Sequence, residues 1–312
     1  MKPEILVLTR IYAPTLAALE RDYIVHKLWT VPDREGLLRE VGRKVRAVVT
    51  SSLTGFQRAQ FEALPKLELI ACFGIGHGAI DVAGAKERGI TITNTPDSIA
   101  ESVADLGTGL IIAVMRRICE TDRFVRAGKW RASLPPLGRD LAGKTCGIVG
   151  LGKIGRCIAK RVEACGMSVC YYGPREKHDT GYSYYSDVEA LAVRSDCVVV
   201  TCASTAATRN LIDAHVLEAL GAQGYLINVA RGAIVDERAL LSALKNGRIA
   251  GAGLDVFWDE PEVPSELIAM DNVVLVPHIG SSTLEIREQR GAHLLANLTA
   301  HFAGQPVPNS LR

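Results

Sequence analysis

Residues 146–156 have the sequence CGIVGLGKIGR, and this stretch indicates the fold of the residues around it. An apolar run, residues 146–149, ends at three glycines, Gly150, Gly152 and Gly155, after which helical sequence continues. The first glycine allows a tight turn, the second leaves room for a diphosphate, and the third lets the helix pack closely on the strand. In this strand–turn–helix setting, the spacing predicts a dinucleotide-binding domain whose helix N-terminus offers free N–H groups to phosphate.

Apolar runs alternate with amphipathic stretches on both sides of this turn. The runs predicted as strands are residues 5–8, 47–50, 69–72 and 90–92, and then 146–149, 168–172, 197–201, 224–229, 251–254 and 273–276. Helices are predicted between the first four, at residues 15–20, 34–41, 56–64 and 82–88. Strands that alternate with helices indicate parallel, doubly wound sheets.

We therefore expect an α/β fold with two such sheets. A Rossmann coenzyme domain, residues 99–284, is inserted into a flavodoxin-like substrate domain made of residues 1–98 plus 285–312. A long apolar-faced helix is predicted to begin the inserted domain, with Asp97 or Ser98 as its cap.

The composition argues against several classes of protein. The 312 residues include 36 Lys or Arg and 34 Asp or Glu, so the formal net charge is only +2. This balance gives no reason to expect nucleic acid or an anionic membrane as a partner, and no apolar run is long enough to span a bilayer. The eight cysteines show neither a CxxC pair nor zinc-ligand spacing, so no metal site is predicted. We expect a cytoplasmic protein with reduced, mostly buried thiols.

The end of the second strand in the predicted coenzyme domain selects between two cofactors. NAD-binding proteins usually place an acid there, which binds the ribose 2′-OH. This chain has Gly173, followed by Pro174 and Arg175. An acid would repel a 2′-phosphate, whereas a glycine does not and an arginine can fork onto it. We therefore expect NADP(H) as the preferred cofactor; NAD(H) is the alternative, with Arg175 solvated and Glu176 or Asp179 on the ribose.

Three isolated polar residues, Arg231, Glu260 and His278, lie at the ends of later apolar runs. Ligands gather at the carboxyl ends of parallel strands, so the three side chains are expected at one edge of the sheet. A guanidinium grips a carboxylate through a charge-assisted fork, an imidazole supplies a proton near neutral pH, and a neighbouring carboxylate orients that imidazole. Together they predict reduction of a 2-oxo acid. Taken singly, Arg231 is also compatible with an ordinary turn and His278 with a half-buried structural histidine.

Over essentially its whole length the chain resembles the D-isomer-specific 2-hydroxyacid dehydrogenase family. The motifs that carry this resemblance are residues 150–155, 229–232, 253–257 with Glu260-Pro261, and 277–280. Residues 116–120 and 171–175 carry a finer resemblance to the family's NADPH-dependent glyoxylate/hydroxypyruvate reductases and hydroxyphenylpyruvate reductases.

The resemblance implies a role for each polar residue of the site. Arg231 would bind substrate, Glu260 would pair with the histidine, His278 would donate the proton in reduction, and Asp255 would lie near the nicotinamide carboxamide. With the glycine turn, the cofactor-binding set expected is Gly150, Leu151, Gly152, Lys153, Ile154, Gly155, Gly173, Pro174, Arg175, Cys202, Thr208, Val229, Ala230, Asp255 and Gly280.

A second glycine-rich loop, residues 73–78, follows the third predicted strand of the first domain. Backbone N–H groups in such a loop can converge on an anion. The loop resembles the family's substrate-carboxylate loop, which makes Ile75 and Gly76 substrate-binding candidates together with Arg231 and His278. Leu53 is expected to line the pocket for the substrate side chain, and His77 to be an exposed loop residue.

Our leading hypothesis is NADPH-dependent reduction of glyoxylate or hydroxypyruvate to the D-2-hydroxy acid. One alternative is a reductase of a bulkier, aromatic 2-oxo acid. Another is a non-catalytic, nucleotide-sensing interaction protein similar to the co-repressors that share this fold. The resemblance also implies a homodimer, with the apolar helix after Asp97 and the Trp130 loop at its interface. Trp130 would either enter the partner's site or pack within that interface.

Overall fold

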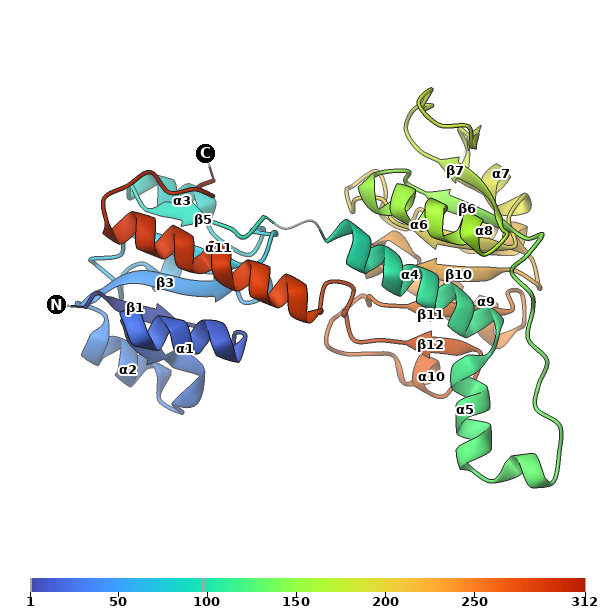
Figure 1. Ribbon diagram of the computed structural model, residues 1–312, viewed down its shortest axis with the longest axis horizontal. Coiled ribbons are helices and arrows are strands. Elements are labelled where there is room, and N and C mark those ends of the chain that lie inside the picture. The colour runs from blue at the N-terminus through green and yellow to red at the C-terminus, as the bar shows by residue number, and fades with distance from the viewer. Residues whose placement is uncertain (1, 97–98, 312) are drawn as a thin grey trace. The chain divides into compact units, whose positions relative to one another are not determined.

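The computed structural model describes residues 2–96 and 99–311, and the chain divides into two compact units (Figure 1). Unit 1 comprises Met1–Ser98 and Thr283–Arg312, and unit 2 comprises Ile99–Ser282. The sequence predicts these divisions after residues 98 and 284. The helix cap predicted at Asp97 or Ser98 lies outside the described residues.

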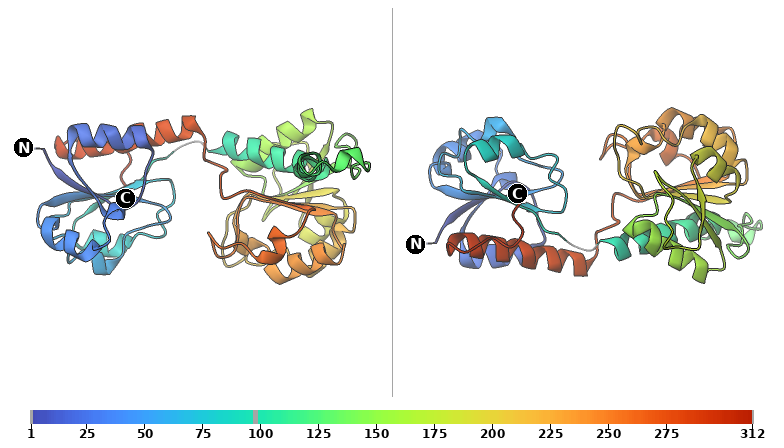
Figure 2. Two further views of the ribbon diagram at one scale, coloured as in Figure 1. Left: turned by 90° about the horizontal axis from the view of Figure 1, so that it is seen from below. Right: turned by 90° about the horizontal axis from the view of Figure 1, so that it is seen from above.

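Unit 1 is built on a five-stranded parallel sheet with the order β2-β1-β3-β4-β5, the flavodoxin-like doubly wound order. Its strands are β1 (Glu4–Val7), β2 (Ile24–Lys27), β3 (Val45–Ser51), β4 (Leu69–Phe73) and β5 (Thr91–Thr93). Helices α1 (Ala13–Asp22) and α11 (Leu284–Phe302) cover one face, and α2 (Arg34–Val41) and α3 (Val82–Glu87) cover the other (Figure 2). Short 3-10 helices η1 (Leu28–Thr30) and η2 (Arg58–Gln60) complete the unit.

Two local predictions in this unit are wrong. The sequence does not predict the edge strand β2, because its residues are exposed or half-buried and do not form an apolar run. One of them, His26, is hydrogen-bonded to Glu4 at 2.9 Å. The helix predicted over residues 56–64 is reduced to the single turn η2. Phe56 forms a parallel bridge with Ile80 instead. The apolar residues Phe56, Phe61 and Leu64 are buried, and the polar residues between them are exposed or half-buried.

Unit 2 is built on a seven-stranded parallel sheet with the order β12-β11-β10-β9-β6-β7-β8. The strands are β6 (Thr145–Val149), β7 (Ser168–Tyr172), β8 (Ser183–Tyr185), β9 (Cys197–Val200), β10 (Tyr225–Asn228), β11 (Gly251–Leu254) and β12 (Val273–Leu275). The strand order reverses between β6 and β9, where doubly wound sheets bind their ligands. The sequence predicts six of the seven strands; β8 was missed because it is a three-residue edge strand with half-exposed side chains.

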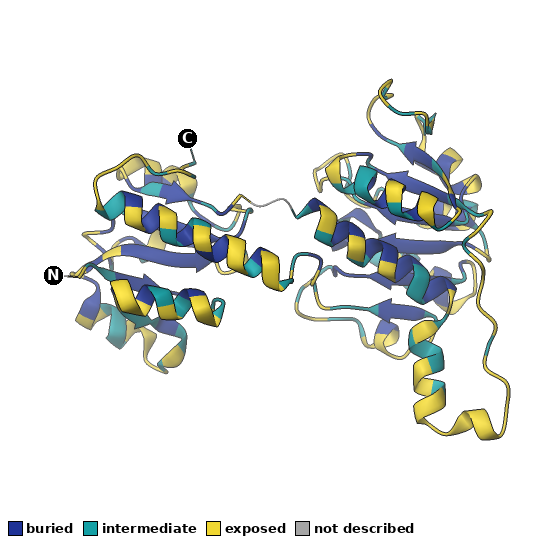
Figure 3. Ribbon diagram, viewed as in Figure 1, coloured by how far each residue is buried: buried dark blue, intermediate teal, exposed yellow. Residues whose placement is uncertain are grey.

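Helices cover both faces of this second sheet. α4 (Ala100–Met115) and α6 (Lys153–Ala164) pack on one face, and α7 (Val188–Val193), α8 (Ala214–Leu220), α9 (Glu237–Lys245) and α10 (Ser265–Ile268) contribute to the core of the other. Figure 2 shows α4 and α6 opposite α9 and α10 across the sheet. Helix α5 (Ile118–Arg126) and the 3-10 turn η3 (Lys129–Arg131) follow α4 and contain no buried residue. In Figure 3 the inner strands of this sheet are buried, whereas α5 and the segment after it are largely exposed.

The apolar runs that predicted the sheet form its interior. Cys146 of β6 and Cys197 of β9 are register partners with no exposed surface, and burial raises the pKa of both thiols. All eight cysteines are free. No helix in residues 2–96 or 99–311 is long and apolar enough to cross a membrane.

Candidate active site

The glycine turn connects β6 to α6 at the point where the strand order reverses. Gly150 has φ +100°, and a Cβ at this position would lie 2.7 Å from the Cα of Cys202. Its N–H donates to the Tyr172 carbonyl (2.9 Å), and its carbonyl accepts from the Thr201 hydroxyl (2.7 Å). Only glycine fits this combination of left-handed backbone and close approach. The two hydrogen bonds hold the turn between β7 and the loop after β9.

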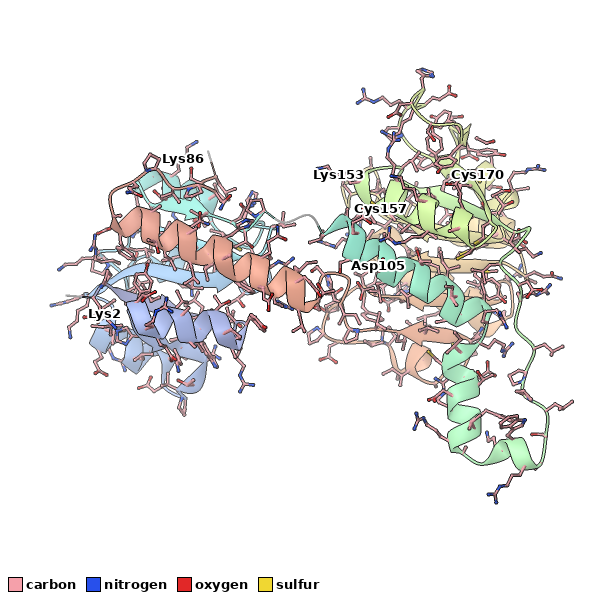
Figure 4. The ribbon with its side chains drawn as sticks, viewed as in Figure 1. Lys2, Lys86, Asp105, Lys153, Cys157 and Cys170 are labelled. Atoms are coloured by element: carbon pink, nitrogen blue, oxygen red, sulfur yellow. The ribbon has the colours of Figure 1, made fainter. Side chains whose placement is uncertain are left out.

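The start of α6 is open toward a ligand. Gly152 is its N-cap residue, no side chain caps the helix, and nothing lies within 4 Å of the place where a Gly152 Cβ would be. Lys153 is exposed at this end of the helix (Figure 4). A helix start with free N–H groups and no side chain in front of it suits a diphosphate. Two other residues of the turn, Leu151 and Gly155, are buried and hold it against the core of the unit.

The far side of α6 is fixed to α4. Arg161 of α6 donates to the Asp105 carboxylate of α4 (2.8 Å) and pairs with the Glu101 carboxylate of the same helix (2.8 Å), while within α6 it donates to the backbone carbonyl of Cys157 (3.0 Å). Figure 4 labels Asp105 and Cys157 on these two helices. The contact gives the helix behind the phosphate position a firm support.

The residues after β7 leave room for a phosphate. Gly173 has no atom closer than 3.9 Å to the position of a Cβ, and its carbonyl accepts from the Tyr184 hydroxyl (3.1 Å). Arg175 is exposed and forms no hydrogen bond or ion pair within the described parts of the chain. Asp179, by contrast, pairs with Arg156 of α6 at 2.7 Å, and this contact lowers the pKa of its carboxyl. Asp179 is therefore engaged, while Arg175 is available for a ligand.

The loop after β9 faces the same edge. Cys202 lies against Gly150, and burial raises the pKa of its thiol to about 11, so it stays protonated at neutral pH. The Thr208 hydroxyl donates to the Ala203 carbonyl (2.7 Å) and accepts from the Thr205 N–H (2.8 Å). Thr208 thus closes this loop through its own side chain.

Asn228 fixes the turn that carries Arg231. This asparagine is 1% exposed at the end of β10; its side-chain oxygen accepts from the Ala230 N–H (3.0 Å), and its amide donates to the Arg231 carbonyl (3.0 Å). Val229 and Ala230 are buried, while the Arg231 side chain is exposed. Sequence reasoning missed Asn228, although a polar residue inside the apolar run 226–230 was a usable signal.

The Arg231 turn is packed against the loop that carries Glu260. A Cβ on Gly232 would overlap the carbonyl oxygen of Phe257. In turn, the Phe257 N–H donates to Glu260 Oε1 at 3.0 Å. The guanidinium-bearing turn and the carboxylate-bearing loop therefore meet backbone to backbone, which only a glycine at 232 permits.

Glu260 and His278 form the hydrogen-bonded pair at the centre of the site. His278 Nδ1 lies 2.6 Å from Glu260 Oε2, and both side chains are partly exposed. His278 has φ +52°, which is a strained backbone conformation for histidine. A hydrogen bond from its own N–H to the Asp255 carbonyl (2.9 Å) stabilises this conformation. With Nδ1 held by Glu260, Nε2 is the ring nitrogen left for a substrate.

Asp255 shapes the segment beyond His278. Its carboxylate is 2% exposed and accepts from the N–H groups of Ile279 (2.6 Å) and Gly280 (3.0 Å). Burial raises the pKa of Asp255, and these two hydrogen bonds oppose that rise. The Gly280 carbonyl is in turn bonded by the Ser102 hydroxyl of α4 (2.7 Å). Asp255, Glu260 and His278 are thus joined, and Arg231 is linked to them through the Gly232–Phe257 contact.

The predicted substrate loop belongs to unit 1. The Asn94 side chain donates to the Ile75 carbonyl (3.0 Å), the Cys72 thiol lies 3.4 Å from the Gly76 carbonyl, and the N–H groups of Ile75 and Gly76 make no hydrogen bond within the described residues. Leu53 is 80% exposed, and His77 is exposed, as expected for a loop residue. Among residues 2–96 and 99–311, no group of His, Cys, Asp and Glu could hold a metal ion.

Residues 108–280 match the model of a known family, the NAD-binding domain of D-isomer specific 2-hydroxyacid dehydrogenases. A glyoxylate/hydroxypyruvate reductase A of Arabidopsis thaliana is 46% identical over 289 residues, which are 93% of this chain and 92% of that protein. A hydroxyphenylpyruvate reductase of Plectranthus scutellarioides is 44% identical over the same shares of the two chains.

A solved structure shows the same architecture. It is the NADPH-dependent glyoxylate/hydroxypyruvate reductase of Sinorhizobium meliloti in complex with NADP and malonate, which superposes with a TM-score of 0.84 at 36% identity. The match covers 100% of this chain and 97% of that one. The predicted fold, two parallel doubly wound sheets, is confirmed by the two sheets observed and by this likeness.

Proposed function

This chain belongs to the D-isomer specific 2-hydroxyacid dehydrogenase family, and we propose that it uses NADPH to reduce glyoxylate and hydroxypyruvate to D-2-hydroxy acids. The observation that carries the proposal is the His278–Glu260 pair at the carboxyl edge of a sheet that also presents an open glycine turn. Relatives named for the same two substrates support the choice of substrate.

His278 acts as the proton donor. Because Nδ1 is bonded to the Glu260 carboxylate, Nε2 carries the proton that passes to the carbonyl oxygen of the substrate. The carboxylate stabilises the protonated ring before transfer and keeps its orientation after it. Phe257 holds Glu260 in place from the other side.

Each unit offers its own groups for a 2-oxo acid, the Arg231 side chain in unit 2 and the loop after β4 in unit 1. The Arg231 guanidinium forks onto the carboxylate and carbonyl oxygens, and its exposed side chain is supported by the turn that Asn228 fixes. The N–H groups of Ile75 and Gly76 bind the carboxylate, and Leu53 lines the position of the substituent. Both groups act on the part of the substrate that every 2-oxo acid shares.

The residues at the edge of the second sheet fit a phosphorylated dinucleotide. NADPH would supply the hydride for the reduction when bound. The uncapped start of α6 and the open space at Gly152 receive the diphosphate, and Arg175 pairs with the 2′-phosphate beside Gly173. Asp255, Gly280, Val229 and Ala230 border the nicotinamide end. Asp179 is held by Arg156, which disfavours it as a ribose ligand and leaves the exposed Glu176 as the acid for the NADH alternative.

Turnover with a panel of 2-oxo acids is the direct test. We expect NADPH oxidation with glyoxylate and hydroxypyruvate, and a kcat/KM for NADPH about 10²-fold above that for NADH, which corresponds to about 2.7 kcal/mol. Faster reduction of an aromatic 2-oxo acid would favour the bulky-substrate alternative. Cofactor binding without turnover, together with capture of a protein partner, would instead favour the non-catalytic alternative.

Gly173→Asp should move the preference toward NADH. Its Cβ makes one ordinary van der Waals contact, with the Arg175 carbonyl oxygen at 3.9 Å, so we expect the variant to fold. Its carboxylate repels a 2′-phosphate while offering an acceptor to a ribose hydroxyl. We expect kcat/KM for NADPH to fall about 10²-fold, with that for NADH unchanged or raised. Gly173→Ala is the matched control, because it adds the Cβ without the charge and should keep the NADPH preference. Equal losses in both variants would contradict the role of charge at this position.

We also propose that the protein is a homodimer. Five large apolar side chains of the α5–η3 arm and the loop after it are exposed, namely Ile118, Val125, Trp130, Leu134 and Leu137. An exposed apolar surface of this kind suits a second copy of the chain. Helix α4 keeps its predicted place in this interface: one face is buried on its own sheet, whereas Leu106, Gly109 and Ile112 on the other are partly or fully exposed.

The compartment we propose is the cytoplasm. All eight cysteines are free, and four of them are buried, which suits a reducing environment.

A further inference from the structure

Three asparagines of unit 1 form a hydrogen-bonded chain that ends at the loop after β4. Asn297 of α11 has no exposed surface; its side-chain oxygen accepts from the backbone N–H (3.2 Å) and the side-chain amide (3.1 Å) of Asn309. The Asn297 amide donates to the Asn94 carbonyl (3.1 Å), and the Asn94 amide donates to the Ile75 carbonyl (3.0 Å). The C-terminal segment is thereby connected to Ile75 through the Asn297 side chain and through the backbone carbonyl and side chain of Asn94.

Backbone contacts hold the C-terminal segment in place. The Asn94 N–H donates to the Asn309 carbonyl (3.2 Å), and the Leu311 N–H donates to the Ile92 carbonyl (2.8 Å). Thr93 and Ser310 form an antiparallel bridge. Residues 309–311 therefore lie along the outer edge of β5, so the last residues of the chain are part of the sheet edge that supports the loop.

Fixing the Ile75 carbonyl also fixes the adjacent N–H group. The Ile75 carbonyl and the Gly76 N–H belong to one planar, trans peptide unit, so they point in opposite directions. Because Asn94 holds the carbonyl on one side, the Gly76 N–H is turned away from Asn94. That N–H makes no hydrogen bond within the described residues, so a ligand can accept it.

If Asn297 served only to fill space in the core, an apolar residue would do so at a lower free-energy cost of burial, because every polar atom of a buried amide must be hydrogen-bonded. Three of its hydrogen bonds lead to Asn94 and Asn309, and through Asn94 to the loop.

We propose that Asn94, Asn297 and Asn309 are positioning residues that aim the Gly76 N–H at the substrate carboxylate, so that the C-terminal segment sets the affinity for the 2-oxo acid. The inference rests on the proposed function, which places that carboxylate at Ile75 and Gly76. None of the three asparagines needs to touch the substrate.

The test uses the full-length variants Asn94→Ala and Asn309→Ala, with Ser310→Ala as the matched control. Ser310 is exposed on the same segment, and its side chain makes no hydrogen bond within residues 2–96 or 99–311. We expect KM for glyoxylate to rise about tenfold in Asn94→Ala and less in Asn309→Ala, because a hydrogen bond that orients a binding group is lost. The kcat and the KM for NADPH should stay within about twofold of wild type, and the control should match wild type.

Amide hydrogen exchange of the unliganded variants gives a second readout. Peptides containing residues 74–78 should exchange faster in both asparagine variants, while peptides from unit 2 should not change. An unchanged KM for glyoxylate in both variants, or equal losses in kcat and in NADPH binding, would overturn the proposal. If wild-type protein shows no turnover, the proposed function fails; unchanged exchange at 74–78 would then overturn the positioning role independently.

Discussion

His278→Gln should lower kcat for 2-oxo acid reduction by about 10²–10⁴-fold, the range that a positioned general acid contributes. Glutamine keeps a polar side chain near Glu260 but cannot deliver a proton from the position of Nε2. The residue lies beyond β12, away from the glycine turn, so NADPH binding should remain within about twofold of wild type. Stopped-flow turnover and fluorescence titration of NADPH measure the two quantities separately.

Two other histidines serve as comparisons. His215→Gln, on the exposed surface of α8, should leave all parameters unchanged. His77→Gln tests the competing assignment, because His77 lies in the glycine-rich loop of unit 1 and is exposed. A near-normal kcat in His278→Gln would remove His278 from its role, and a collapse in His77→Gln would transfer that role to the loop.

The sequence predicted the second sheet well because its strands are buried on both faces. Runs such as Val198–Val200 and Leu226–Ile227 are fully buried and apolar, so no alternation obscures them. The polar residues that end these runs stand out for the same reason. Glu260 and His278 were predicted to pair because their runs end at one edge of a parallel sheet, and their side chains lie 2.6 Å apart.

The remaining features depend on contacts between distant residues, which spacing does not reveal. Edge strands β2 and β8 carry polar residues because one of their sides is open. Nothing in the local sequence indicates that Asn297 bonds to Asn94, which lies more than two hundred residues earlier. The obligate glycine at 232 likewise follows from Phe257, a residue on a different strand's loop.

Arg231→Gln should lower kcat/KM for glyoxylate by about two to three orders of magnitude. Removing one partner of a desolvated, hydrogen-bonded charge pair costs about 2–5 kcal/mol, partly because the substrate carboxylate is left unpaired. The turn itself should survive, because Asn228 holds it through backbone atoms of Ala230 and Arg231. NADPH affinity should therefore change little, and steady-state kinetics with both substrates varied separates the two effects.

Arg231→Lys distinguishes charge from geometry. Lysine keeps the positive charge but loses the planar fork, so it should recover only part of the loss in Arg231→Gln. Full recovery would show that a point charge suffices and that Arg231 does not grip carboxylate and carbonyl together. Arg238→Gln, an exposed arginine on α9, controls for the change in net charge. If Arg238→Gln lost activity as Arg231→Gln does, long-range attraction of the anionic substrate would replace direct binding as the explanation. Raising the ionic strength would then also lower the activity of the wild-type protein.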